Sequence, residues 1–195
     1  MHAVGHIKVC FQDEKTGRLS SPIIDKKNLV LFEGADIMSA LLAGKANFAI
    51  SHMYFQYRNS AETFEINNPI TRGDGRAAFD AIDGEDPVED WLRVPLITLP
   101  KQVQIPEGSA DYQSNGVWFT GTSAASPTLE GESPAHNPFT ASGETPSRIF
   151  SVALVSAPAP GDNKQDRVFS RVNFEEPLEL PAGKHLVVFW LLRFN

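Results

Sequence analysis

Hydrophobic residues recur along this chain in short runs that are separated by turn-forming residues. Short apolar runs bounded by Gly, Pro, Asn and Asp are typical of β-strands. On this basis the sequence predicts strands over residues 7–11, 28–32, 48–57, 116–120, 147–157, 166–174 and 185–194. It also predicts two short strands within the segment "WLRVPLITLPKQVQI" (91–105), broken at Pro95 and Pro100.

The last of these runs, 185–194, carries apolar side chains on both of its faces. One face would hold Leu186, Val188, Trp190, Leu192 and Phe194, and the other Val187, Phe189 and Leu191. A strand that is apolar on both sides is covered on both sides, as in the centre of a sandwich. The preceding "LPAGK" supplies Pro and Gly where the chain must reverse.

A helical pattern is found in "EGADIMSALLAG", and we expect a short α-helix at about residues 34–43. Ile37, Met38, Leu41 and Leu42 fall at spacings that place them on one helical face. Gly44 follows, where a left-handed residue would end the helix. A helix of this length can cover one face or one open end of a sheet.

Taken together, these elements predict a mainly β protein with a β-sandwich or jelly-roll-like fold. We expect a single domain over residues 1–195, with long loop insertions at about 59–93 and 106–147. Loops of such length are usually functional, or become ordered when a partner binds.

Composition and charge exclude several classes of function. The 195 residues carry a net charge of −7 with no basic stripe, so we expect no nucleic-acid binding. The longest apolar run, 186–192, is far shorter than the roughly 20 residues of a membrane-spanning helix, and no secretory signal opens the chain. We therefore expect a soluble protein. Cys10 lies in "IKVCF" and is expected to be a buried hydrophobic residue in a chain that folds in a reducing cytosol.

Ser123 is the candidate nucleophile, because "GTSAASP" resembles the segment around the catalytic serine of subtilisin-like proteases. In that family the serine opens a long apolar helix, whereas here residues 128–134 contain two glutamates and a proline. The mechanism also needs a base and an orienting carboxylate. The upstream histidines, His2, His6 and His52, lie in no matching motif. We expect Ser123 to belong to a loop and not to act as a nucleophile.

Other candidate sites are read in the same way. Arg72-Gly73-Asp74 matches a short integrin-recognition motif, but a tight turn is the expected role. An acidic run could bind a hard cation, but its spacing does not fit an EF-hand, so a solvated loop is expected; it comprises Asp80, Asp83, Glu85, Asp86, Glu89 and Asp90. Whether this 80–90 loop binds a cation stays open.

Two further groups of residues were considered as a metal site and as a pair of catalytic carboxylates. His2 and His6 have a spacing that suits a metal on a helix, yet no Cys or third His lies nearby. Glu175-Glu176 and the acids near Trp91 could form a glycosidase pair, but nothing in the sequence places them across a cleft. We therefore assign no catalytic, metal-binding or cofactor-binding residue and expect no cofactor and no enzymatic activity.

Two segments resemble small virion structural proteins of tailed bacteriophages. They are "KNLVLFEGADIMSALLAGKANFAISHMYFQY" (27–57) and the block "IFSVALVSAP…DRVFSRVNFEEPLELPAGKHLVVFWLLRF" (149–194). The resemblance implies a capsid decoration or cement protein, or alternatively a tail or fibre adaptor. It further implies a homo-oligomeric or lattice-bound protein that contacts the major capsid protein or other virion proteins. Such a protein is made in the host cytoplasm and located in the virion.

Overall fold

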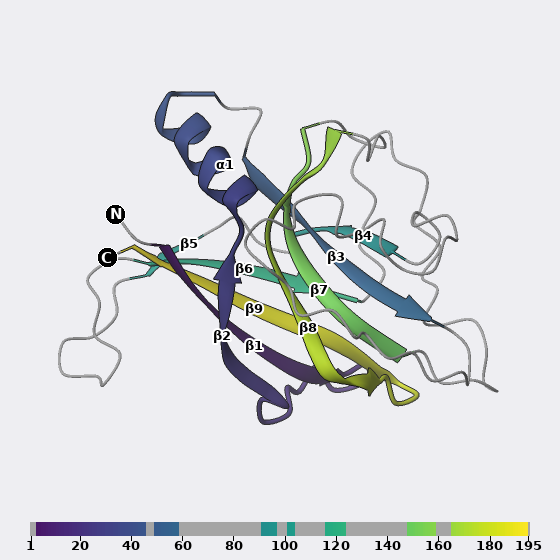
Figure 1. Cartoon of the computed structure of the whole chain (residues 1–195). Helices are drawn as coiled ribbons and strands as arrows, with labels where there is room; N and C mark the ends of the chain where they lie inside the picture. The colour runs from purple at the N-terminus through teal and green to yellow at the C-terminus, as the bar shows by residue number, and fades with distance from the viewer. Residues whose placement is uncertain are drawn as a thin grey trace.

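The computed structural model describes residues 3–45, 49–58, 91–96, 101–103, 116–123, 148–158 and 165–194. Within these residues the chain forms strands and one short helix, which confirms the mainly β prediction (Figure 1). In chain order the elements are β1 (Ala3–Asp13), β2 (Ile24–Val30), α1 (Phe32–Leu42), β3 (Ile50–Arg58), β4 (Trp91–Pro95), β5 (Lys101–Val103), β6 (Gly116–Thr122), β7 (Arg148–Ser156), β8 (Arg167–Glu179) and β9 (Lys184–Phe194).

The strands form two antiparallel sheets that share strand β2. Sheet A has the order β2-β1-β9-β6-β5, and sheet B the order β4-β3-β7-β8-β2. The first part of β2, from Ile24 to Asn28, pairs with β1, whereas Leu29 and Val30 pair with β8. Strand β2 therefore passes from one sheet to the other and forms the corner at which the two layers meet.

The main hydrophobic core lies between the two sheets. Ile7, Val9 and Trp190 contribute to it from sheet A, and Phe55 and Leu154 from sheet B. The two sheets approach each other closely at Gly121 of β6. A Cβ atom added at this position would overlap the sulfur of Met53 on β3. As predicted for the last strand, the core-facing set includes Leu186, Val188, Trp190 and Leu192.

Helix α1 covers one end of the sandwich, above the upper ends of the strands in Figure 1. Its Ile37 is fully buried in the main core, and its Gly34 lies against the backbone of Phe169 on β8. Gly44 has φ +78°, and the amide of Lys45 donates to the carbonyl of Ala40 at 3.0 Å, which is the glycine-capped ending that the sequence predicted.

Leu42 does not share the buried face of the helix, so that part of the prediction is wrong. Its side chain is 75% exposed, whereas Met38 and Leu41 pack against the core. The buried stripe passes through Gly34, Ile37 and Leu41, and the next residue along is rotated by about 100° away from it.

Several strand boundaries also differ from the prediction. The run 28–32 is divided, since β2 ends at Val30 and Phe32 begins the helix. Strand β1 begins earlier than expected because it pairs with β9 along its whole length, from Ala3↔Phe194 to Asp13↔Lys184. Of the expected loop insertions, residues 59–90, 104–115 and 124–147 lie outside the part of the chain that the structure describes.

Candidate functional site

Ser123 lies directly after β6 and is completely buried. Its backbone amide donates to the carbonyl of Leu186 at 2.9 Å, and its hydroxyl oxygen accepts from the amide of Leu186 at 2.8 Å. The residue thus extends the pairing between β6 and β9 by one step. A buried hydroxyl in this position satisfies a backbone donor that would otherwise lack a partner. The remainder of "GTSAASP" lies outside the described residues.

The other sequence candidates are dispersed. Arg72-Gly73-Asp74, the acidic run of 80–90 and His2 lie outside the described residues. His6 lies on β1, where its Nε2 contacts the carboxylate of Asp25. Glu175 and Glu176 are exposed on β8. Across the described ranges, no group of three or more His, Cys, Asp or Glu side chains is arranged to hold a metal ion.

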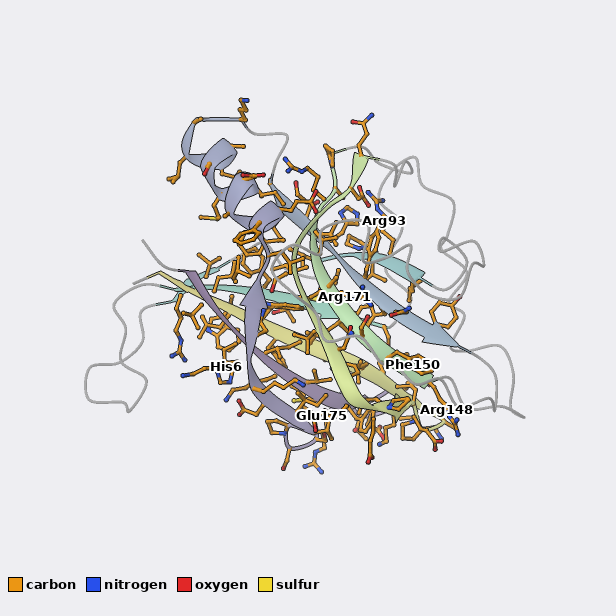
Figure 2. The ribbon with its side chains drawn as sticks, in the orientation of Figure 1. His6, Arg93, Arg148, Phe150, Arg171 and Glu175 are labelled. Carbon is orange, nitrogen blue, oxygen red and sulfur yellow. The ribbon has the colours of Figure 1, made fainter. Side chains whose placement is uncertain are left out.

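A buried polar cluster, which the sequence analysis did not identify, lies on the outward face of sheet B. The carboxylate of Asp166, just before β8, accepts from the hydroxyl of Tyr54 on β3 and, at 2.9 Å, from Nε of Arg93 on β4. Asp166 and Tyr54 are buried, and Arg93 is mostly so. Figure 2 shows Arg93 near the α1 end of this sheet. The three side chains join strands that are far apart in the sequence.

The environment fixes the protonation of this cluster. Burial, reinforced by the neighbouring Asp166 carboxylate, raises the pKa of Tyr54 far above its usual value, so its hydroxyl remains a donor. His52 lies two residues earlier on β3, and burial together with the charge of Arg93 lowers its pKa to about 4. His52 is therefore neutral at pH 7, and its Nδ1 is 2.8 Å from the hydroxyl of Ser51.

Further along the same face, a second buried network surrounds Gln56. Its side-chain oxygen accepts from the hydroxyl of Ser151 at 2.9 Å and from Nη2 of Arg171 at 3.1 Å. Nε of Arg171 also donates to the side-chain oxygen of Asn173 at 3.1 Å. This guanidinium lies in the middle of the sheet in Figure 2, between strands β3 and β8. The network therefore fixes three strands of sheet B relative to one another.

The networks around Asp166 and Gln56 hold the strands of sheet B together, and neither contains an activated nucleophile. The Asp166 carboxylate already accepts two hydrogen bonds from protein donors, and the raised pKa of Tyr54 prevents that hydroxyl from acting as a base at neutral pH. Two buried polar atoms, Nε2 of His52 and Oδ1 of Asp166, have no hydrogen-bond partner among the described residues. The geometry is that of a structural polar layer on a sheet.

The signal for this layer was present in the sequence but incomplete. In "SHMYFQY" the polar side chains of His52, Tyr54 and Gln56 alternate with the core residues Met53 and Phe55. That alternation places the polar residues on one face of β3. Their partners could not be identified from spacing, because Tyr54 and Asp166 are 112 positions apart in the chain.

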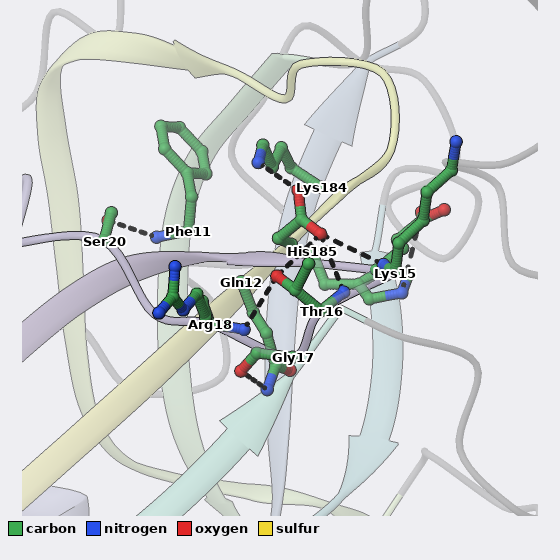
Figure 3. A network of polar contacts seen from close by, with 11 residues as sticks. Phe11, Gln12, Lys15, Thr16, Gly17, Arg18, Ser20, Lys184 and His185 are labelled. Carbon is green, nitrogen blue, oxygen red and sulfur yellow. Dashed lines mark hydrogen bonds and ion pairs between the residues drawn. The ribbon is translucent and has the colours of Figure 1, made fainter.

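A polar network at the surface connects two turns (Figure 3). The carboxylate of Asp13, at the end of β1, accepts from the amide and hydroxyl of Thr16 at 2.8 and 2.9 Å, and from Nζ of Lys184 at 2.6 Å. The hydrogen bond from Lys184, followed by those from Thr16, lowers the pKa of Asp13 far below its usual value. This network fixes the β1–β2 turn against the start of β9 and offers no reactive group.

No protein-family model matches the chain, and neither does any curated protein or solved structure. In the described part of the chain, no helix is long and apolar enough to cross a membrane.

Proposed function

We propose that this chain is a non-enzymatic structural protein of a tailed-bacteriophage virion, namely a decoration protein that binds the capsid and stabilises it. The proposal takes its class of protein from the resemblance of residues 27–57 and 149–194 to small virion proteins. Its partner is the major capsid protein or another protein of the particle, and its location is the virion.

One observation about the surface carries the proposal: large apolar side chains are exposed at both ends of β2. Leu19 and Ile23, in the β1–β2 connection, are 48% and 39% exposed, while Phe32 and Leu42, on α1, are 63% and 75% exposed. The connection and the helix lie at opposite ends of β2 in Figure 1. Leu19 and Ile23 share one connection, whereas Phe32 and Leu42 are the first and last residues of α1. Exposed large apolar residues mark surfaces that bind other proteins where they form a contiguous patch.

The separation of these two sites suits a protein that bridges neighbours. Strand β2 has seven residues, so its ends are about 20 Å apart at the usual rise of a strand. Between them, the polar networks around Asp166 and Gln56 tie the strands of sheet B together. A stiff body with a binding site at each end can hold two surrounding subunits at a fixed distance.

The copy number per particle tests this proposal. Particles of the phage that encodes the chain would be purified, and the chain and the major capsid protein quantified in the same gel. A decoration protein is expected in numbers comparable to those of the capsid protein. A handful of copies would instead indicate the tail or fibre adaptor, and absence from the particle would contradict the proposal altogether.

A further inference from the structure

Two buried polar atoms of sheet B are left over by its hydrogen-bond networks. Nε2 of His52 and Oδ1 of Asp166 have no hydrogen-bond partner within the described ranges, and their residues are only 7% and 3% exposed. Leaving a buried polar atom unsatisfied costs about 1–3 kcal/mol, and more when the group is charged. Both atoms therefore require a further hydrogen-bond partner.

The contacts of Ser51 determine which ring nitrogen of His52 carries the proton. The Ser51 hydroxyl donates to the carbonyl of Ala157 at 3.4 Å, which uses its single proton. Nδ1 of His52 is 2.8 Å from the same hydroxyl oxygen and must then donate to it. The ring is neutral at pH 7, because burial and the charge of Arg93 lower the pKa of His52 to about 4. Its Nε2 is therefore an acceptor, as is the carboxylate oxygen of Asp166.

The two acceptors belong to one group of side chains on the outward face of sheet B. Tyr54 lies directly opposite Arg93 in the pairing of β3 with β4, and His52 is the preceding residue on the same face of β3. Asp166 accepts from both Tyr54 and Arg93. Neighbouring side chains on one face of a strand are about 6.6 Å apart. A single molecule that makes two hydrogen bonds of about 2.8 Å spans about 5.6 Å, which suits this spacing.

We infer that an internal water molecule binds between Nε2 of His52 and Oδ1 of Asp166 and donates one hydrogen bond to each. Water is a small neutral molecule with two donors, and buried waters typically bridge polar groups that lack protein partners. A metal ion or an ammonium group would also be attracted by two acceptors. However, the Arg93 guanidinium, whose Nε donates to Asp166 at 2.9 Å, repels a second cation at this position. The chemistry of the site therefore selects a neutral ligand.

The bound water extends the polar layer towards the start of β3. Tyr54 and Arg93 already connect β3 and β4 to Asp166, and the water adds His52 as a further connection. A water held in this way is a constant part of the fold and is costly to remove. The site is independent of the proposed function, because it depends only on contacts within one molecule.

A crystal structure of the full chain that resolves ordered water tests the site directly. We expect one peak of solvent density within hydrogen-bonding distance of Nε2 of His52 and Oδ1 of Asp166, without the anomalous signal of a metal. A direct hydrogen bond between these two side chains, a protein donor bonded to either atom, a metal ion, or a site without solvent density would each overturn the inference.

The tautomer of His52 can be measured in solution by nuclear magnetic resonance. At pH 7 the nitrogen chemical shifts of its ring should be those of the form protonated at Nδ1. A ring protonated at Nε2 would contradict the assignment of this nitrogen as an acceptor, and the inference would fail.

Oxygen-17 relaxation dispersion, which detects long-lived internal waters, provides a comparison between variants. His52→Phe keeps an aromatic ring but removes the acceptor, so it should hold one long-lived water fewer than the wild type. His185→Phe, a control at a partly exposed histidine, should hold the same number as the wild type. Equal numbers of long-lived waters in His52→Phe and the wild type would rule out the bridging water.

Discussion

At the scale of single residues, the buried cluster of sheet B contains the interactions with the largest expected effect on stability. Asp166 is a buried carboxylate held by Tyr54 and Arg93, and removing one partner from a buried charge pair costs more than the pair contributes as a whole. Arg148 and Glu179 form a comparable pair, 2.9 Å apart, but the glutamate is mostly exposed. Comparing the two pairs therefore shows how burial changes the contribution of an ion pair to stability.

We predict that Asp166→Ala lowers the free energy of unfolding by about 3 kcal/mol, because the Arg93 charge and the Tyr54 hydroxyl then lose their acceptor. The control Glu179→Ala should lower it by less than about 1 kcal/mol, as is usual for an exposed ion pair. Urea unfolding followed by Trp fluorescence measures both. Equal losses in the two variants would contradict this role for Asp166.

His52 supplies a prediction about pH. Its pKa is lowered from 6.5 to about 4 in the folded protein, so below pH 6.5 the unfolded chain binds a proton that the folded chain does not. The contribution of His52 to the free energy of unfolding is therefore fully present above pH 6.5. It is lost as the pH decreases toward 4, by at most about 3 kcal/mol. Asp13 and Asp25, whose pKa values are also lowered, lose their contribution only at lower pH.

The unfolding midpoint in urea, measured between pH 7.5 and 4.5, tests the effect of His52. In His52→Gln the decline across this range should be mostly abolished, whereas in His185→Gln, a control at a partly exposed histidine, it should persist. A decline of the same size in His52→Gln and in the wild type would show that another group titrates.

At the scale of the elements, helix α1 depends on a close approach rather than on helix propensity. Ala normally stabilises a helix interior by about 1 kcal/mol relative to Gly. At position 34, however, a Cβ atom would overlap the backbone carbonyl oxygen of Phe169. We predict that Gly34→Ala lowers the free energy of unfolding by about 2 kcal/mol, because α1 must move away from β8.

Ser39→Ala is the control for this prediction, since Ser39 is exposed on the same helix and should change stability by less than about 0.5 kcal/mol. Thermal unfolding measures both variants. If Gly34→Ala were as stable as the wild type or more stable, the contact between α1 and β8 would be looser than described.

The elements themselves could be predicted from the sequence, because apolar runs and turn residues are local signals. The strand at 185–194, with its two apolar faces, and the glycine that ends the helix were both confirmed. The exposure of Leu42 and the bulge in β8, where residues 174–177 lie opposite Phe150 of β7, were not foreseen. Both depend on which neighbour covers a residue, and a pattern of apolar and polar positions does not identify that neighbour.

The polar layer was missed for the same reason. Arg93 and Asp166 are 73 positions apart, and only the pairing of β4, β3, β7 and β8 brings them together. For Ser123, in contrast, the local motif "GTSAASP" suggested a nucleophile but did not indicate what the side chain contacts. Its hydroxyl is hydrogen-bonded to the backbone of β9, a contact that depends on the pairing of β6 with β9.

At the scale of the whole molecule, the described residues form a two-layer body stiffened by a buried polar layer, with exposed apolar residues at both ends of β2. A body with separate exposed apolar side chains, and with Tyr54, Asp166 and Gln56 engaged in hydrogen bonds within sheet B, fits the repeating assembly proposed above.

The position of the protein on the particle decides whether it is a decoration protein. Purified particles would be imaged by electron microscopy after labelling with an antibody raised against the chain. For a decoration protein we expect label distributed over the whole capsid surface in a regular pattern. Label restricted to the tail or to a single vertex, or particles that carry no label, would contradict it.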